Sequence, residues 1–231
     1  MAAVPLHRPN RPTADARRSA AGRAAEELRR RIEDAELAPG TRLAEVALAA
    51  ELDVSRNSLR EAFATLAAER LLVRRPNRGV VVASPDADQV REIYQTRRII
   101  ELGALRFGRL TPPVQAELRR VVTLLAPDPG AVDRRSMGEA NQRLHTAIAA
   151  MTMAPDLQRT LRQAMARMRL AFQPLDTETE LHPLFAHRNL EYAHALLAGR
   201  QEQLYEPMAA YLDEAERFVL EHLREREDAG D

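Results

Sequence analysis

The stretch from Leu43 to Val82 constrains this chain most, because two short helical patterns there are followed by two β-rich runs. Asp53 lies between the helical patterns and suits a tight turn, since Asp tolerates left-handed backbone. Ser55 then predicts the start of the second helix as its N-cap. Each helix has one apolar face, formed by Ala44, Ala47, Leu48 and Leu52 in the first and by Leu59, Ala62, Phe63 and Leu66 in the second. Together they predict a helix-turn-helix, whose second helix enters the DNA major groove.

The first turns of the second helix carry side chains suited to reading DNA. Arg56 can pair with guanine and Asn57 with adenine, while serine hydroxyls can reach phosphates or bases. The candidate DNA-contacting residues of this helix are Ser55, Arg56, Asn57, Ser58 and Arg60.

A basic hairpin is predicted directly after the helices. The runs at 71–73 and 80–82 are separated by RRPNRG, in which Pro76, Asn77 and Gly79 indicate a turn. Such a hairpin is the wing of a winged helix and would place Arg74, Arg75 and Arg78 beside the DNA backbone. The alternative is a small helical core with solvated arginines. The agreement of turn, cap, polar helix start and basic hairpin favours the winged helix.

The segment from Leu28 to Val82 resembles the winged-helix domain of GntR-type bacterial transcription regulators. The matching pieces are ELAPGTRL, VSRNSLREAF and RPNRG. Asp53 is a departure, because the family usually has Gly there. With the resemblance, the candidate DNA-binding residues are Arg42, Ser55, Arg56, Asn57, Ser58, Arg60, Arg78 and Gly79.

Length and composition limit the other functions open to the chain. Its 231 residues, 45% of them hydrophobic, allow one large domain or two small ones. The absence of Cys excludes disulfides, thiolate metal sites and a cysteine nucleophile. We expect no membrane span and no secretory signal, and therefore a cytoplasmic protein. Residues 1–82 hold 15 Arg against 11 acidic residues, and residues 83–231 hold 19 Arg against 23. The basic half is the half expected to meet DNA.

The sequence divides into three parts. Residues 1–20 are a predicted disordered tail, and residues 21–83 are a winged helix-turn-helix of three helices plus a hairpin, with the first helix beginning near Gly22 and ended by Pro39-Gly40. Residues 84–228 show only helical periodicity and predict an all-α bundle of six to seven helices, so the fold class is mainly α. The first expected helix of the bundle has Ser84 as N-cap and Pro85 at its first helical position. Five more are expected at Pro112 to about Leu125, Val132 to Met151, Pro155 to Phe172, His182 to Ala198, and Arg200 to Glu227. Pro207 predicts a kink or break in the last of them.

The helical part resembles the effector domain of the FadR branch of these regulators. The matching segments are IYQTRRIIELGALRFGRL, NQRLHTAIA and AHRNLEYAHALLAGRQEQLYEPMAAYL. Many family members hold a divalent metal with one Asp and three His, and the resemblance places these ligands at Asn141, His145, His187 and Tyr211.

The two departures from that ligand set leave alternatives open. His145 and His187, with waters, could still hold Zn²⁺, Ni²⁺ or Mn²⁺ weakly. Alternatively, the cavity has abandoned the metal and binds an organic ligand directly, and we favour this reading because a neutral phenol is a poor metal ligand. Arg97 could then supply a cation for a carboxylate. The plainest alternative is that both histidines are ordinary core residues.

These features predict a ligand-responsive transcription regulator and not an enzyme. A homodimer would bind a palindromic operator in double-stranded DNA, with repression the commoner mode in the family, and a small metabolite, such as a carboxylate, would bind in the helical domain. One alternative is an enzyme carrying a DNA-binding appendage, although a matching catalytic constellation is missing. Another is an architectural DNA-binding protein that senses nothing.

Overall fold

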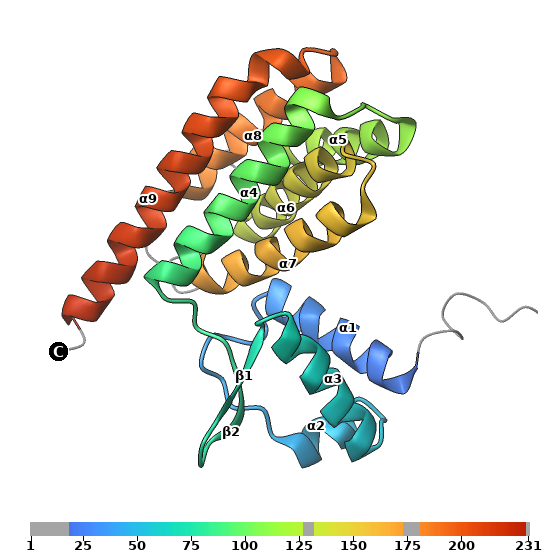
Figure 1. The fold of residues 1–231 in the computed structure, drawn as a ribbon, viewed down its shortest axis with the longest axis vertical. Coiled ribbons are helices and arrows are strands. Elements are labelled where there is room, and N and C mark those ends of the chain that lie inside the picture. Colours follow the sequence, from blue (N-terminus) through green and yellow to red (C-terminus); the bar gives the residue numbers. More distant parts are fainter. Residues whose placement is uncertain (1–18, 127–131, 173–180, 230–231) are drawn as a thin grey trace, which may run out of the picture.

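The computed structural model describes residues 19–126, 132–172 and 181–229, and within them it separates a small N-terminal part from a helical bundle (Figure 1). The N-terminal part contains α1 (Ala20–Glu33), α2 (Glu45–Glu51), α3 (Arg56–Ala68), β1 (Leu72–Arg75) and β2 (Gly79–Val82). The bundle contains α4 (Ala87–Phe107), α5 (Pro112–Leu125), α6 (Arg134–Ala150), α7 (Pro155–Phe172), α8 (Leu181–Leu197), the short 3₁₀ helix η1 (Gln201–Leu204) and α9 (Tyr205–Ala229). The predicted fold class, a winged helix-turn-helix followed by an all-α bundle, is confirmed.

The helix-turn-helix forms as its local sequence dictates. Asp53 adopts the left-handed conformation with φ of 50°. Ser55 caps α3, and its hydroxyl accepts a hydrogen bond from the backbone N–H of Ser58 at 3.1 Å. The predicted apolar face of α3 is buried: Leu59, Ala62, Phe63 and Leu66.

The wing is a two-stranded antiparallel hairpin. Leu72 lies opposite Val82, and Arg75 lies opposite Gly79. The turn between the strands uses left-handed backbone at Asn77, with φ of 61°, and at Gly79, with φ of 74°. Arg42 adds an isolated antiparallel bridge to Val81, so the segment before α2 is fixed to the wing.

Two helix boundaries differ from the sequence prediction. The long helix after the wing begins at Ala87, and its N-cap is Asp86 instead of Ser84. Asp86 is the N-cap because it forms a reciprocal capping box with Gln89. Its carboxylate accepts a hydrogen bond from the Gln89 backbone N–H at 2.9 Å, and the Gln89 side chain accepts one from the Asp86 backbone N–H at 3.3 Å. The first helix begins at Ala20 and ends at Glu33, well before Pro39.

The expected interruption near Pro207 also occurs, but earlier in the chain. The structure has η1 and then α9, and Pro207 lies in the first turn of α9. A proline is tolerated there because the first N–H groups of a helix have no intrahelical acceptor.

The bundle packs around α4, α6 and α8. Helix α4 contacts α9, α7 and α6, while α5 packs against α6 and α8. None of the helices in the described ranges is long and apolar enough to cross a membrane. The predicted disordered tail, residues 1–20, lies almost entirely outside the described residues.

Helix α7 belongs to both hydrophobic cores. Its residues Met165 and Met168 are buried in the bundle, whereas Ala166 and Leu170 are buried in the core of the winged-helix part. Helix α1 lies against α7 at this junction (Figure 1). The two parts of the chain are therefore joined by packed side chains as well as by the connection between β2 and α4.

Leu170→Ala should destabilise the protein by about 2–5 kcal/mol, because it leaves a cavity in a fully packed junction. The free energy of unfolding from urea denaturation measures this loss. The matched control is Leu157→Ala on the same helix, where the side chain is 42% exposed and the loss should be much smaller. Equal losses in the two variants would contradict the shared-core interpretation.

Candidate functional site

The N-terminal turns of α3 present two exposed arginines that share one acidic partner. Arg56 Nε lies 3.3 Å from Glu45 Oε1, and Arg60 Nε lies 2.8 Å from the same oxygen. The hydrogen bond from Arg60 is the main interaction that lowers the pKa of Glu45, so this carboxylate stays charged. Asn57 is exposed on the same turn. Arg56, Asn57 and Arg60 are thus on the surface, and Glu45 holds the two arginines close together.

The wing supplies a second basic surface. Arg42 and Arg78 are exposed, together with Arg74 and Arg75 on β1. Helix α2 and the hairpin turn lie at the end of the molecule away from the bundle (Figure 1). The hairpin turn and its arginines are therefore not covered by the bundle.

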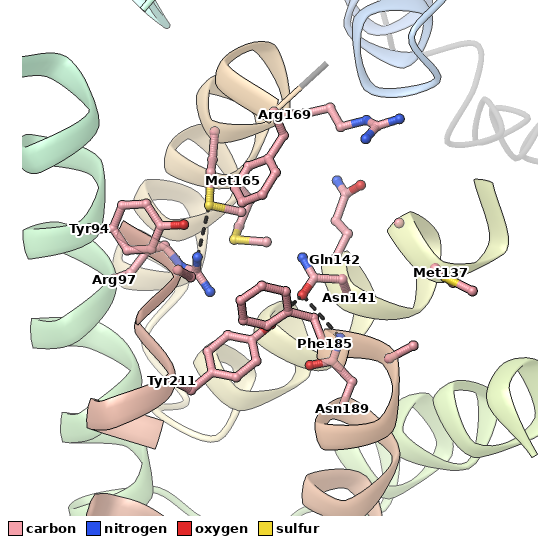
Figure 2. Close-up of a pocket in the computed structure, with 15 residues that line it drawn as sticks. Tyr94, Arg97, Met137, Asn141, Gln142, Met165, Arg169, Phe185, Asn189 and Tyr211 are labelled. Carbon is pink, nitrogen blue, oxygen red and sulfur yellow. Dashed lines mark hydrogen bonds between the residues drawn. The ribbon is translucent and has the colours of Figure 1, made fainter. Parts of the chain in front are cut away.

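The bundle contains a small pocket of about 60 Å³ among α4, α6, α7, α8 and α9 (Figure 2). That space is several times the roughly 10–15 Å³ that one water molecule needs. Much of the wall is apolar, with Met137, Met165, Met168, Phe172 and Phe185.

Asn141 is the centre of a hydrogen-bond network at the pocket. Its Oδ1 accepts from the Tyr211 hydroxyl at 2.9 Å and from Asn189 Nδ2 at 3.1 Å. The Nε2 atom of His145 lies 3.2 Å from the same oxygen and 3.4 Å from the Tyr211 hydroxyl. Helices α6, α8 and α9 are thereby joined at one half-buried side chain.

A buried charge network lies beside this centre. Arg97 Nε donates to Glu101 Oε1 at 2.9 Å, and His145 Nδ1 donates to Glu101 Oε2 at 2.5 Å. Burial lowers the pKa of His145, so the ring is neutral at pH 7. Burial alone would raise the pKa of Glu101, but His145 and Arg97 outweigh it and lower that pKa. The network therefore holds a guanidinium, a carboxylate and a neutral imidazole.

Three buried polar atoms in the described residues have no hydrogen-bond partner, and all three belong to residues that line the pocket. They are the Tyr94 hydroxyl, Arg97 Nη2 and Asn189 Oδ1. An unsatisfied buried polar group costs roughly 1–3 kcal/mol. Their coincidence at one cavity indicates a place where a polar ligand or ordered water supplies the missing partners.

The structure brings together four of the five residues expected at this site. Arg97, Asn141, His145 and Tyr211 converge, but His187 does not join them. His187 is exposed, because α8 turns a different face inward, formed by Ala186, Asn189 and Ala193. The expectation that His187 faces the site is therefore corrected.

The residues of this site do not fit a metal ion. His145 is the sole histidine in the cluster, and its Nδ1 is taken by Glu101. Within the described ranges, no three His, Cys, Asp or Glu side chains come close enough to hold a metal. The weak Zn²⁺, Ni²⁺ or Mn²⁺ site considered from the sequence thus lacks a donor set here, since His145 and His187 do not converge.

The sequence prediction omitted Glu101, Asn189, Tyr94, Gln142 and Arg169 from the site. Glu101 and Tyr94 had a detectable signal, because both lie on the helical stripe that buries α4. A charged residue four positions after Arg97 on such a stripe indicates a buried ion pair. Asn189 gives no such signal.

Two family models account for most of the chain. Residues 20–82 match bacterial regulatory proteins of the gntR family, and residues 92–214 match the FCD domain. These matches identify a DNA-binding transcription regulator with a helical C-terminal domain, and not an enzyme. The chain belongs to the GntR family of bacterial regulatory proteins.

Relatives of known description agree with this assignment. The chain is 29% identical to the Nta operon transcriptional regulator of Aminobacter aminovorans, over 82% of this chain and 84% of that one. It is 38% identical to the gluconate operon transcriptional repressor of Bacillus subtilis, over 45% of this chain and 43% of that one. A solved structure of a GntR-type regulator from Rhodococcus sp. RHA1 superposes with a TM-score of 0.76 at 32% identity, covering 87% of this chain and 97% of that chain.

The neutral His145 predicts a pH-dependent stability. The usual pKa of a histidine is 6.5, and burial lowers that of His145. At pH values below 6.5 the ring is therefore protonated in the unfolded chain but stays neutral in the folded one, so stability falls as the pH falls from 7 toward 5. His145→Gln removes this titration and should flatten the curve over that window. Thermal unfolding between pH 7 and pH 5 measures the difference. The matched control is His194→Gln, which changes an exposed histidine on α8 in the same way. Parallel curves for wild type and His145→Gln would show that the ring is not buried neutral.

Proposed function

We propose that this regulator binds a palindromic operator as a homodimer, acts as a repressor and is controlled by a small carboxylate bound in the bundle pocket. In this proposal residues 21–83 bind DNA, and residues 84–228 bind the effector and dimerise. The observation that carries the effector site is the group of three unpartnered buried polar atoms lining one cavity.

A carboxylate suits the inner end of that pocket. Arg97 Nη2 and the Tyr94 hydroxyl are two donors from neighbouring turns of α4, and the Arg97 guanidinium lies 5.1 Å from the Tyr94 ring. Guanidinium groups bind carboxylates with charge-assisted hydrogen bonds. The apolar wall from Met165 and Phe185 would cover the hydrocarbon part of such a ligand. The pocket volume limits the ligand to a small molecule.

In this proposal the effector controls repression by changing the affinity of the protein for its operator. A ligand shifts operator binding only if it binds the DNA-competent and DNA-incompetent arrangements with different affinity. The gluconate operon repressor of Bacillus subtilis is 38% identical to 45% of this chain, which supports the repressor mode. The effector then lowers operator affinity and relieves repression.

Arg56→Ala and Arg60→Ala should each weaken binding to the operator, because base-contacting arginines contribute about 1–3 kcal/mol of discrimination. The operator is first obtained by selecting random duplexes with the full chain, and affinity is then measured at fixed salt. Discrimination against unrelated DNA should fall in both variants. Arg78→Ala should instead weaken all sequences alike and lower the salt dependence, as expected for a phosphate contact.

The matched control is Arg106→Ala, which removes an exposed arginine from α4 in the bundle. Its operator affinity should equal that of wild type. If Arg56→Ala and Arg60→Ala both retain wild-type affinity, α3 is not the recognition helix and the proposed DNA interface is wrong.

The full chain should be a dimer in solution, because one recognition helix reads only a few base pairs and a palindrome matches a two-fold symmetric protein. Light scattering at micromolar concentration should give twice the chain mass of 25.9 kDa. A monomer that also binds the selected operator with one copy per duplex would contradict the homodimer.

A further inference from the structure

Helix α3 ends in a left-handed residue that carries a long charged side chain. Arg70 follows the C-cap of α3 and has φ of 59°. The Leu71 N–H donates to the Leu66 carbonyl at 2.9 Å, and the Arg70 N–H donates to the Ala67 carbonyl at 3.0 Å. These two hydrogen bonds form a Schellman motif, in which glycine is the residue most often found at the left-handed position. Arginine carries a Cβ and is disfavoured there, so its presence needs a physical explanation.

The Arg70 side chain crosses from the winged-helix part to the bundle. Its Nη1 lies 2.6 Å from Oε2 of Glu92, on the second turn of α4. The other carboxylate oxygen of Glu92 lies 3.4 Å from Nη1 of Arg167, on α7. The hydrogen bond from Arg70 is the main interaction that lowers the pKa of Glu92, so this carboxylate is charged. Together, Arg70, Glu92 and Arg167 form an ionic clasp between the two parts of the chain.

Folding stability does not account for an arginine at position 70. The Arg70 and Glu92 side chains are 59% and 49% exposed, and exposed ion pairs add little to stability. Glycine would remove the conformational penalty and leave the Schellman hydrogen bonds in place, because these use only backbone atoms. What Arg70 adds is a direct contact that ties the end of α3 to the bundle.

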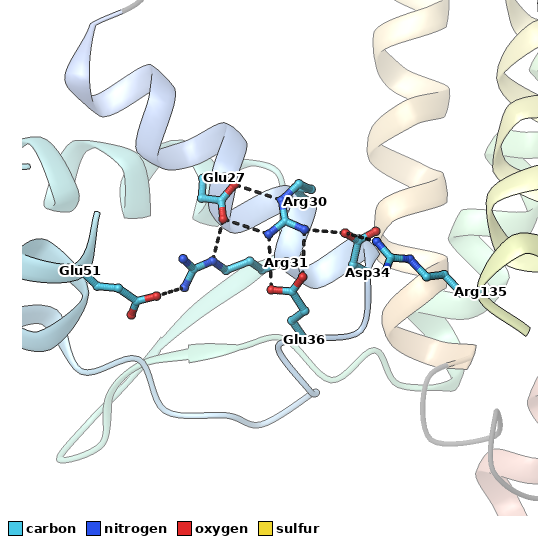
Figure 3. Close-up of polar contacts among 7 residues, drawn as sticks. All are labelled: Glu27, Arg30, Arg31, Asp34, Glu36, Glu51 and Arg135. Atoms are coloured by element: carbon cyan, nitrogen blue, oxygen red, sulfur yellow. Dashed lines mark hydrogen bonds and ion pairs between the residues drawn. The ribbon is translucent and has the colours of Figure 1, made fainter. Parts of the chain in front are cut away.

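The clasp acts at a different place from the packed junction. The packed contacts bring α1 onto α7, and α3 packs on α1. A second ion pair between the two parts is found just after α1, where Arg135 of α6 lies 3.4 Å from Asp34 (Figure 3). Asp34 is already paired with Arg30 at 2.5 Å, so Arg135 adds little to a helix that α7 already holds. The clasp instead holds the end of α3 itself, and so opposes rotation of the winged-helix part about the contact between α1 and α7.

We propose that the ionic clasp fixes the angle between the recognition helix and the bundle, and thereby determines which half-site spacing the operator must have. Arg70 is a positioning residue in this inference, which rests on the proposed homodimer and palindromic operator. In that dimer the two bundles are joined, and each recognition helix is held by its own bundle. The angle at each junction then sets the separation and relative rotation of the two recognition helices. The half-site spacing of a palindrome mirrors this geometry.

The experiment compares operators that differ only in the number of base pairs between their half-sites. The palindrome selected with the full chain is lengthened or shortened by one and two base pairs, and affinity is measured at fixed salt. Each added base pair turns one half-site by about 35° relative to the other, so a rigid dimer distinguishes the spacings. The spacing ratio is the affinity for the best spacing divided by that for its neighbours. A duplex with one half-site is the reference for local recognition.

Arg70→Gly should reduce the spacing ratio about two- to fivefold, the range expected for loss of an exposed ion pair. Affinity for the single half-site should stay within about twofold of wild type. The reason is that α3 is about 20 Å long and charges are screened over about 10 Å at 0.1 M salt. Arg70→Lys keeps the charge and should retain most of the wild-type ratio. Thermal unfolding should show Arg70→Gly to be at least as stable as wild type, because glycine fits the left-handed backbone.

Glu92→Gln removes the opposite charge of the clasp and should reduce the spacing ratio in the same direction. The substitutions at positions 70 and 92 change the net charge with opposite signs. A general effect on attraction to DNA would therefore differ in sign between them, whereas loss of the clasp affects both variants alike. The matched control is Asp88→Asn, which neutralises another exposed carboxylate on α4, about one turn earlier, and should keep the wild-type ratio.

The outcomes separate this inference from the function on which it rests. If the wild type binds a single half-site as tightly as any spaced pair, the homodimer on a palindrome is wrong and the spacing role falls with it. If the wild type selects one spacing and either Arg70→Gly or Glu92→Gln keeps its ratio, the dimer stands and the clasp does not position the recognition helix. A loss in Arg70→Lys equal to that in Arg70→Gly, or a loss in Asp88→Asn equal to that in Glu92→Gln, would also overturn the role of the clasp.

Discussion

The arrangement of this protein depends on α7, a helix that is buried in two cores at once. Leu170 and Ala166 fill the winged-helix core, while Met165 and Met168 fill the bundle. Protein interiors are close-packed, so a shift of such a helix is felt on both sides. Arg169 lies between these faces and bonds to the end of α1. A change inside the bundle therefore has a direct mechanical route to the DNA-binding part.

The buried charge network of Arg97, Glu101 and His145 contributes little to the stability of the fold. A buried ion pair is weak evidence for stability, because removing two charges from water is costly and apolar packing is often at least as stable. This network also leaves Arg97 Nη2 without a hydrogen-bond partner in the described residues. A cost of this kind is typical of sites that bind something. In the proposed function, a bound ligand would supply the partner that Arg97 Nη2 lacks.

The sequence predicts the winged helix more completely than the pocket, for a physical reason. The N-cap at Ser55, the left-handed Asp53 and the hairpin turn each depend on a few neighbouring residues, so local rules suffice. The pocket depends on how five helices rotate and cross. The family resemblance located Asn141, His145 and Tyr211, but the inward face of α8 was misjudged, and Asn189 takes the place expected for His187.

Glu45 joins the two exposed arginines at the start of α3. It pairs with both Arg56 and Arg60, and exposed ion pairs of this kind contribute at most about 1 kcal/mol each. If Arg56 and Arg60 contact DNA as proposed, DNA would displace Glu45 at small cost, while the pair limits the conformations of both arginines before binding. Helix α3, which carries them, packs on α1, and the end of α1 bonds to Arg169 at the pocket. In the proposed function, this series of contacts from Arg169 through α1 to α3 would connect the pocket with the DNA-binding surface.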